Sequence, residues 1–164
     1  MNAASSNPPG RVLAIDYGTV RLGLAISDPQ QQFASPHANY SRVNPERDVD
    51  YLRRVVGDES VAEIVVGLPV HLDGRESEKS IEARRFGAWL AAEIGTPVKF
   101  FDERFTTVEA EHQLQSAKLS RKQRQARRDM LAAQLLLAAY LESDRSSAPS
   151  APRGLDDRSP NGSD

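Results

Sequence analysis

The chain has 164 residues, of which 39% are apolar and 27% are charged, and these values predict one globular domain. The 21 Lys and Arg residues nearly balance the 23 Asp and Glu residues, so the net charge of −2 excludes a protein that is basic over its whole surface. The lack of cysteine excludes disulfide frameworks, thiolate nucleophiles and zinc sites built on sulfur. No apolar run approaches the roughly 18 residues that span a membrane, and residues 1–10 do not resemble a signal peptide. We therefore expect a cytoplasmic protein.

Both ends of the chain are poor in large apolar residues. Residues 1–10 are small, polar and proline-rich, and residues 143–164 contain Leu155 as their only large apolar side chain. Such segments cannot bury enough surface to offset the entropy lost on ordering. We expect both ends to be disordered and the folded domain to span residues 11–142.

The first part of this domain is rich in β-forming residues. Residues 11–16 and 20–27 are expected to form two strands around a tight hairpin at Tyr17-Gly18-Thr19. Residues 33–40 are expected to form a third strand. Pro36 within it cannot donate a ladder hydrogen bond, which favours an edge position.

Helical and strand patterns then alternate. A helix is expected from Pro45 to Gly57, with Asp48 among its apolar positions, and residues 61–67 indicate a buried strand. A second helix is expected over residues 77–94, closed by Gly95, and residues 98–101 indicate a further strand. The face of that second helix expected to pack on the core consists of Ile81, Arg85, Ala88, Trp89 and Ala92.

Two more helices are expected near the end of the domain. A capping box at Thr106-x-x-Glu109 predicts the start of one. Residues 130–141 are almost wholly apolar, and we expect them to form a helix that packs closely against a sheet.

This order predicts an α/β domain with a five-stranded mixed sheet flanked by helices. Three consecutive strands followed by alternating helices and strands indicate an antiparallel meander that is extended by parallel crossovers. With right-handed crossovers, the simplest strand order is 3-2-1-4-5. The first strand is then central, and a site is expected at its carboxyl end.

Acidic residues lie at three places where such a site could form. Asp16 ends the first strand before Gly18, where it could be a metal or phosphate ligand or could simply suit the turn. Asp102 and Glu103 follow the last strand; we expect only one of them to enter a site, since neighbours on an extended chain face opposite sides, and ordinary loop polarity is the alternative. Asp129 precedes the apolar helix as its expected N-cap, where it could also be held near the strand ends.

A basic segment comes directly before Asp129. Residues 118–128 contain six cations, no acid and no regular apolar stripe, so we expect a mobile loop in the free protein. A charge run is usually a solvated loop, but this one places cations beside acids that could hold divalent metal ions, a pairing that points to a polyanionic substrate. The six cations are Lys118, Arg121, Lys122, Arg124, Arg127 and Arg128.

Four segments resemble, in order and spacing, the YqgF/RuvX family of bacterial pre-16S rRNA nucleases and Holliday-junction-resolvase-like proteins. They are RVLAIDYGTVRLGLAISD (11–28), IVVGLPVHLDG (64–74), DERFTTVEAE (102–111) and DMLAAQLLLAAYLE (129–142). The combination is specific, whereas the DYGT motif alone also occurs in actin-like ATPases and sugar kinases. Val20, His71 and Met130 stand where the family commonly has a Lys, an Asn and a small or charged residue.

The resemblance implies a ribonuclease-H-like fold and, by analogy, metal-assisted hydrolysis of phosphodiester bonds. The family's catalytic acids fall on Asp16, Glu103 and Asp129, and Asp102 is a further candidate metal ligand beside Glu103. In the implied two-metal mechanism, Asp16 contacts both Mg²⁺ or Mn²⁺ ions, while Glu103 and Asp129 each complete the shell of one ion.

The resemblance also implies a nucleic-acid partner. The six cations of residues 118–128, together with Arg104, would position the backbone without reading sequence. The implied substrate is the 5′ region of pre-16S rRNA, processed during ribosome biogenesis. A four-way DNA junction is the alternative within the same chemistry, and it predicts a homodimer with twofold symmetry. A non-catalytic assembly factor that binds nucleic acid and keeps the fold is another alternative.

Overall fold

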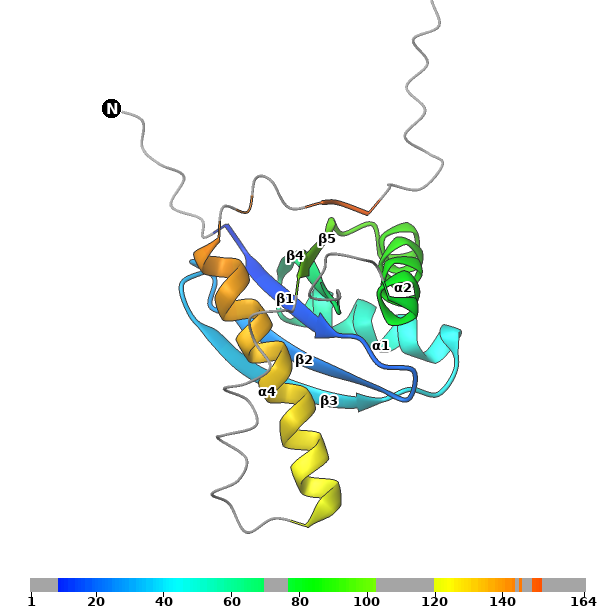
Figure 1. The fold of residues 1–164 in the computed structure, drawn as a ribbon. Coiled ribbons are helices and arrows are strands. Elements are labelled where there is room, and N and C mark those ends of the chain that lie inside the picture. Colours follow the sequence, from blue (N-terminus) through cyan, green and yellow to red (C-terminus); the bar gives the residue numbers. More distant parts are fainter. Residues whose placement is uncertain (1–8, 70–76, 103–119, 144, 146–148, 152–164) are drawn as a thin grey trace, which may run out of the picture.

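A five-stranded mixed sheet lies between two layers of helix in the computed structural model (Figure 1). The structure describes residues 9–69, 77–102, 120–143, 145 and 149–151. The strands are β1 (Arg11–Asp16), β2 (Arg21–Ser27), β3 (Ala34–Ser41), β4 (Val61–Leu68) and β5 (Val98–Asp102). The helices are α1 (Pro45–Asp58), α2 (Glu78–Ile94) and α4 (Arg121–Glu142).

The strand order is β3-β2-β1-β4-β5, which confirms the order expected from the sequence. β2 pairs antiparallel with β1 and β3, whereas β4 pairs parallel with β1 and β5. Pro36 lies in the edge strand β3, as predicted. This topology is the one expected for a ribonuclease-H-like fold, and it brings the carboxyl ends of β1, β4 and β5 to one edge of the sheet.

Each face of the sheet has its own apolar core. Leu13 and Ile15 of β1 belong to the core that α1 and α2 cover, while Val12 and Ala14 belong to the core under α4. Figure 1 shows α4 crossing one face, with α1 and α2 on the other. Because β1 is buried on both faces, its sequence is an unbroken apolar run.

The buried face of α2 differs from the expected one. Ile81, Arg85 and Ala92 of the predicted face are exposed, and Ala88 and Trp89 are only partly buried. The residues that pack inward are Ser80, Ala83, Phe86, Gly87, Leu90 and Ala91. The prediction was wrong because it followed the large side chains. A Cβ on Gly87 would lie 2.5 Å from the ring of Phe100, so the sheet fills the space that a large helical residue would need.

The start of α4 also corrects the sequence prediction. The helix begins at Arg121, where Ser120 and Gln123 form a capping box, and not at residue 130. The basic residues 121–128 are therefore helical rather than a mobile loop. Asp129 lies more than two turns inside the helix and does not cap it. Lys118 lies outside the described residues.

Residues after α4 return to the sheet. The amide of Phe100 donates to the carbonyl of Pro149 at 2.8 Å, and the amide of Ala151 donates to that of Val98 at 2.8 Å. The expected disordered tail from residue 143 is therefore wrong for residues 149–151, which cover the outer edge of β5. At the other end, the carbonyl of Gly10 accepts from the side chain of Gln31 at 2.9 Å, although disorder was expected through residue 10.

The helix predicted at Thr106-x-x-Glu109 lies outside the described residues. Within the part of the chain that the structure describes, no helix is both long and apolar enough to cross a membrane.

Candidate active site

Asp16 is the last residue of β1, the central strand. Side chains alternate along a strand, so Asp16 lies on the same face as Val12 and Ala14, which is the face covered by α4. It is partly exposed, and in the antiparallel register its partner on β2 is Gly23. The structure thus places one carboxylate at the carboxyl end of the central strand, under the α4 layer.

The backbone of Asp129 in α4 packs directly on Gly23, which is the β2 partner of Asp16. A Cβ on Gly23 would be 2.1 Å from the carbonyl oxygen of Asp129, so only glycine permits this approach. The Nε of Arg21, two residues earlier on β2, donates to Oδ2 of Asp129 at 3.2 Å. At the far end of α4, the hydroxyl of Tyr140 donates to the carboxylate of Glu63 on β4. The middle and the carboxyl-terminal end of the helix are therefore tied to the sheet.

Asp102 is not brought to this face. Val98 and Phe100 of β5 pack into the core under α2, whereas Phe101 packs against the core under α4. By alternation, Asp102 lies on the α2 face. Glu103 and Arg104 lie outside the described residues. Among the described residues, no three His, Cys, Asp or Glu side chains are close enough to hold a metal ion.

Arg42 binds the turn that follows Asp16. Its Nη1 donates to the carbonyl of Gly18 at 3.1 Å, and its Nε donates to Asp48 at 3.0 Å. A Cβ on Gly18 would lie 2.4 Å from the carbonyl oxygen of Arg21, so the tightness of the turn also requires glycine. Asp48, in the first turn of α1, is only 1% exposed.

Asp48 is held in its charged form by three donors. Burial by itself would raise the pKa of Asp48, but hydrogen bonds from the Val43 amide, Arg42 and Tyr40 bring that pKa below the usual value of 3.8. Burial, and then the hydrogen bond to Asp48, raises the pKa of Tyr40 to about 12. The pair of Asp48 and Arg42 is thus ionised at neutral pH, and it lies next to the turn that follows Asp16.

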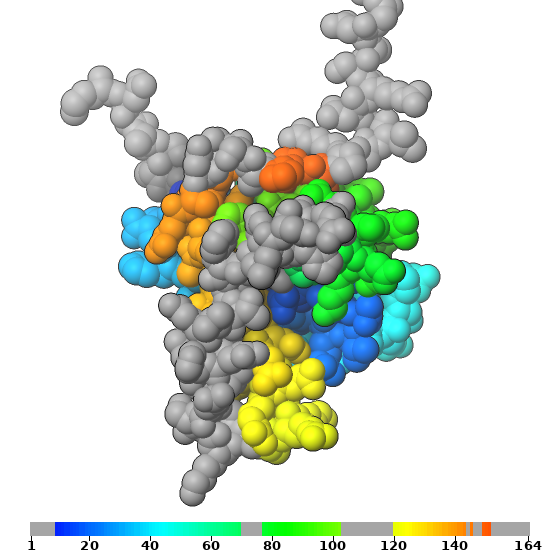
Figure 2. Space-filling model, viewed as in Figure 1, coloured from blue at the N-terminus to red at the C-terminus, as the bar shows by residue number. Residues whose placement is uncertain are grey.

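The basic residues of α4 form an exposed arm. Figure 2 shows the first turns of α4, in yellow, standing out from the rest of the molecule. Helical spacing places Arg121, Arg124 and Arg128 on one stripe that is separate from the buried face of the helix. All five described cations of the segment are exposed; they are Arg121, Lys122, Arg124, Arg127 and Arg128.

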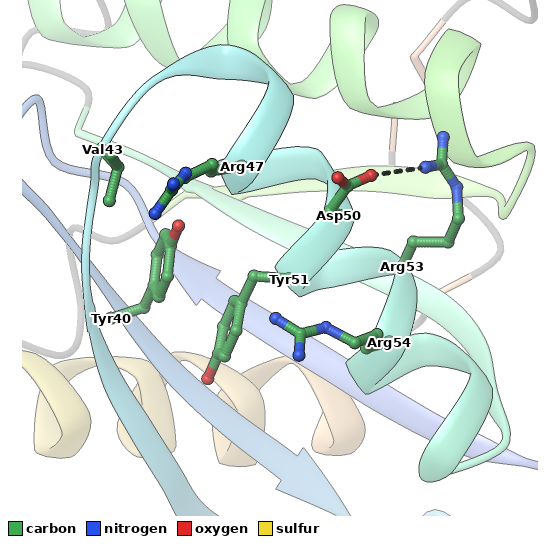
Figure 3. Close-up of a pocket in the computed structure, with 7 residues that line it drawn as sticks. All are labelled: Tyr40, Val43, Arg47, Asp50, Tyr51, Arg53 and Arg54. Carbon is green, nitrogen blue, oxygen red and sulfur yellow. Dashed lines mark hydrogen bonds and ion pairs between the residues drawn. The ribbon is translucent and has the colours of Figure 1, made fainter.

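A second basic surface lies on the other side of the sheet, at α1 and β3. A groove of about 670 Å³ there contains the stacked rings of Tyr40 and Tyr51, with centroids 4.1 Å apart (Figure 3). Asp50 pairs with Arg53 at 3.1 Å. The other arginines that line the groove, Arg47 and Arg54, make it positive, and it is suited to a phosphate group.

A family model described as "RuvX: Holliday junction resolvase" matches residues 10–143. This chain belongs to the RuvX family. The matched residues cover every strand and helix that the structure describes, from β1 to α4.

Similar proteins from several bacteria are named "Putative pre-16S rRNA nuclease". The relative from Rhodopirellula baltica is 47% identical over 136 residues, which cover 83% of this chain and 79% of the relative. The relative from Koribacter versatilis is 45% identical over 133 residues, covering 81% and 87%. A solved structure titled "T. thermophilus RuvC in complex with Holliday junction substrate" is 18% identical, covers 86% of this chain and 99% of that chain, and has a TM-score of 0.49.

Sequence reasoning missed two arginines of this RuvX site. Nothing in the sequence marked Arg21 as the partner of Asp129, because the two residues are far apart along the chain and meet only when α4 packs on β2. Arg42 was missed although a signal existed. Asp48 interrupts the apolar stripe of α1, and an acid at such a position predicts a buried ion pair.

Proposed function

We propose that this protein is a metal-dependent nuclease of the cytoplasm that hydrolyses phosphodiester bonds in the 5′ region of pre-16S rRNA. The single observation that supports the proposal is the packing of the Asp129 backbone on Gly23, the β2 partner of Asp16 at the carboxyl end of the central strand. The basic residues of α4, from Arg121 to Arg128, directly precede Asp129 on the same helix. The relatives from Rhodopirellula baltica and Koribacter versatilis are both named "Putative pre-16S rRNA nuclease".

The donor set fits a hard divalent cation. Asp16 and Asp129 offer carboxylate oxygens, which are the ligands that Mg²⁺ and Mn²⁺ prefer. Alternation along β5 favours Glu103 over Asp102 as the third ligand, since Asp102 lies on the α2 face. We propose that Asp16, Glu103 and Asp129 hold the metal. When bound, the metal supplies an activated water and stabilises the charge on the leaving oxygen.

The chain's other residues orient these acids and the substrate. The Nε of Arg21 binds Oδ2 of Asp129, and its positive charge partly offsets the negative charges of Asp16 and Asp129. Arg121, Arg124 and Arg128, with the other cations of the α4 arm, attract the phosphate backbone without reading bases. Lys118 and Arg104 are proposed for the same role.

A second substrate class is supported by the name of the family model, which describes a Holliday junction resolvase. Cleavage of a four-way DNA junction needs two symmetric cuts, so this alternative also requires a homodimer with twofold symmetry.

The experiment offers a 5′ pre-16S rRNA fragment and a four-way DNA junction side by side, with Mn²⁺ or EDTA. We expect Mn²⁺-dependent cleavage of the rRNA fragment. The variant Asp16→Asn should cleave at least about 100-fold more slowly, since loss of even an outer partner of a metal ligand costs 10- to 100-fold. Its folding should be unchanged, because Asp16 is partly exposed.

The matched control is Asp58→Asn, which removes an equal charge from an exposed residue at the end of α1. This residue lies just before β4 begins, at the opposite edge of the sheet from Asp16. Normal cleavage by Asp16→Asn would contradict the nuclease proposal. Preferential cutting of the junction would replace rRNA by branched DNA, and cleavage of neither substrate would leave a binding module.

A further inference from the structure

A pocket of about 300 Å³ opens beside the turn that follows Asp16, on the α1 and α2 side of the sheet. Its volume is at the lower end of the range of ligand pockets, which suits one flat ring system. Tyr17, Phe86 and Trp89 line it in a row of tilted rings, with centroids 5.1 Å apart for Tyr17 and Phe86 and 5.8 Å apart for Phe86 and Trp89.

One wall of this pocket is rigid. The guanidinium of Arg42 lies 5.5 Å from the ring centre of Tyr17 and 5.4 Å from that of Phe86. It is fixed there by its bonds to the buried Asp48 and to the carbonyl of Gly18. Because its charge is already paired, Arg42 serves this pocket as a flat surface and not as an anchor for phosphate.

The other two charged residues of the pocket, Glu82 and Arg85, have opposite charges. Glu82 and Arg85 lie one turn apart on α2, are both exposed, and line the opening. A carboxylate accepts from amino groups and an arginine donates to ring nitrogens and carbonyls, so the pair matches the mixed edge of a nucleobase. The groove at α1 and β3 is different, because it has three arginines and one acid and therefore favours phosphate.

We propose that this pocket binds one unpaired nucleobase of the nucleic-acid substrate, stacked against Tyr17 and Trp89. Aromatic and arginine planes are the surfaces on which proteins stack the splayed bases of single-stranded RNA. Tyr17 directly follows Asp16 in the chain, so the two side chains lie on opposite faces of the sheet. A base held there places the adjoining backbone at the edge where Asp16 ends β1. This inference rests on the proposed nuclease function and names the form of its substrate.

The test uses the fluorescence of Trp89, the only tryptophan of the chain. The full chain in EDTA is titrated with a fluorescein-labelled RNA hexamer of adenylate and with the same ribose-phosphate backbone lacking bases. Anisotropy of the label reports binding, and Trp89 emission reports stacking. We expect saturable quenching by the hexamer and none by the abasic backbone, which should also bind more weakly.

Variants separate stacking from fold. Tyr17→Ala should weaken hexamer binding by about 5- to 150-fold, the range for losing one base–aromatic stack. Tyr17→Phe keeps the ring and should bind within about twofold of the wild type. Phe33→Ala is the matched control, because Phe33 is a 70% exposed aromatic residue that follows β2 at the opposite edge of the sheet. It should change neither signal.

Equal binding of the hexamer and the abasic backbone, unchanged affinity in Tyr17→Ala, or binding without quenching would each overturn the inference. The outcome is distinct from that of the proposed function, because binding is measured in EDTA and cleavage in Mn²⁺. Cleavage without quenching would contradict the nucleobase pocket and support the nuclease function. Quenching without cleavage would support the nucleobase pocket and contradict the nuclease function.

Discussion

Side-chain alternation along β1 and β5 decides which acids can share a site. Asp16 lies on the α4 face, and Asp102 lies on the α2 face of a strand two positions away. Neighbouring strands are about 4.8 Å apart, so β1 and β5 are separated by about 10 Å. An acid from the chain after β5 therefore has to be on the correct face and has to reach across β4. This argument makes Glu103, rather than Asp102, the residue to test as the third ligand.

The buried pair of Asp48 and Arg42 is expected to dominate the acid sensitivity of the fold. Asp48→Asn should lower the free energy of unfolding at pH 7 by roughly 2–4 kcal/mol, slightly less than the loss of one partner from a fully buried pair, because the Arg42 side chain is 20% exposed. The folded-state pKa of Asp48 lies below 3.8, so this stability is present above that value and is lost as the pH falls through the folded pKa.

Urea unfolding of both proteins between pH 7 and pH 2.5 checks this expectation. The difference between wild type and Asp48→Asn should shrink below about pH 4. Asp50→Asn is the control, because its pair with Arg53 is exposed and should contribute less than about 1 kcal/mol. A difference that is constant over the whole pH range would show that shape, and not charge, makes Asp48 necessary.

The contact between β2 and α4 seats the backbone of Asp129 on Gly23, the β2 partner of Asp16. Gly23→Ala would push a methyl group into the backbone of Asp129, and backbone atoms cannot move aside as a flexible side chain can. We expect a loss of about 1–3 kcal/mol in the free energy of unfolding. Cleavage should fall about 100-fold, since a shift of about 1 Å in a catalytic group has that effect.

Gly57→Ala provides the comparison for this substitution. Gly57 lies in α1, and its added Cβ would have no atom within 4 Å among the described residues, apart from its chain neighbours and the nearby backbone of its own helix. Alanine there should raise the free energy of unfolding by about 0.4–1 kcal/mol without any change in cleavage. Equal effects of the two substitutions would show that α4 is not seated on Gly23 in solution.

The helical state of residues 121–128 changes what the basic segment can do. On a helix, Arg121, Arg124 and Arg128 share one stripe and can follow one backbone together. Changing all three to Ala should make the slope of log affinity against log salt less steep by about 2 for single-stranded RNA, at ~0.7 per phosphate contact. The triple Lys variant keeps the charge and should keep the slope. An unchanged slope in the Ala variant would show that the RNA backbone does not bind along this stripe of α4.

The sequence predicted the sheet better than it predicted the helices. The apolar run of β1, the turn at Gly18 and the edge position indicated by Pro36 are local signals, so the strand order followed from them. The start of α4 was misplaced because its first turns have no apolar stripe, yet the capping box of Ser120 and Gln123 was readable. The pairing of Asp129 with Arg21 was not readable, since it depends on two elements meeting in space.

Residues 149–151 cover the edge strand β5 of the sheet. Residues 149–151 form a bridge with it through Lys99 and Ser150, and Ala151 is only 7% exposed. In Figure 1 this short segment, in orange-red, runs past the end of β5. An uncovered edge strand presents unpaired amides and carbonyls that can join a second chain. The segment is thus expected to protect the monomer as well as to stabilise it.

Two truncations separate these effects. A chain ending at residue 152 keeps the bridge, whereas one ending at residue 147 loses the hydrogen bonds of Phe100 to Pro149 and of Ala151 to Val98. At about 0.5–1.5 kcal/mol for each bond, the shorter chain should lose roughly 1–3 kcal/mol in the free energy of unfolding, measured in urea. Sedimentation should also detect its self-association through the exposed edge of β5. The longer chain should match the wild type in both measurements. Equal stability of the two truncations, with both monomeric, would mean that β5 needs no cover and that dimers, if they form on a DNA junction, use another surface.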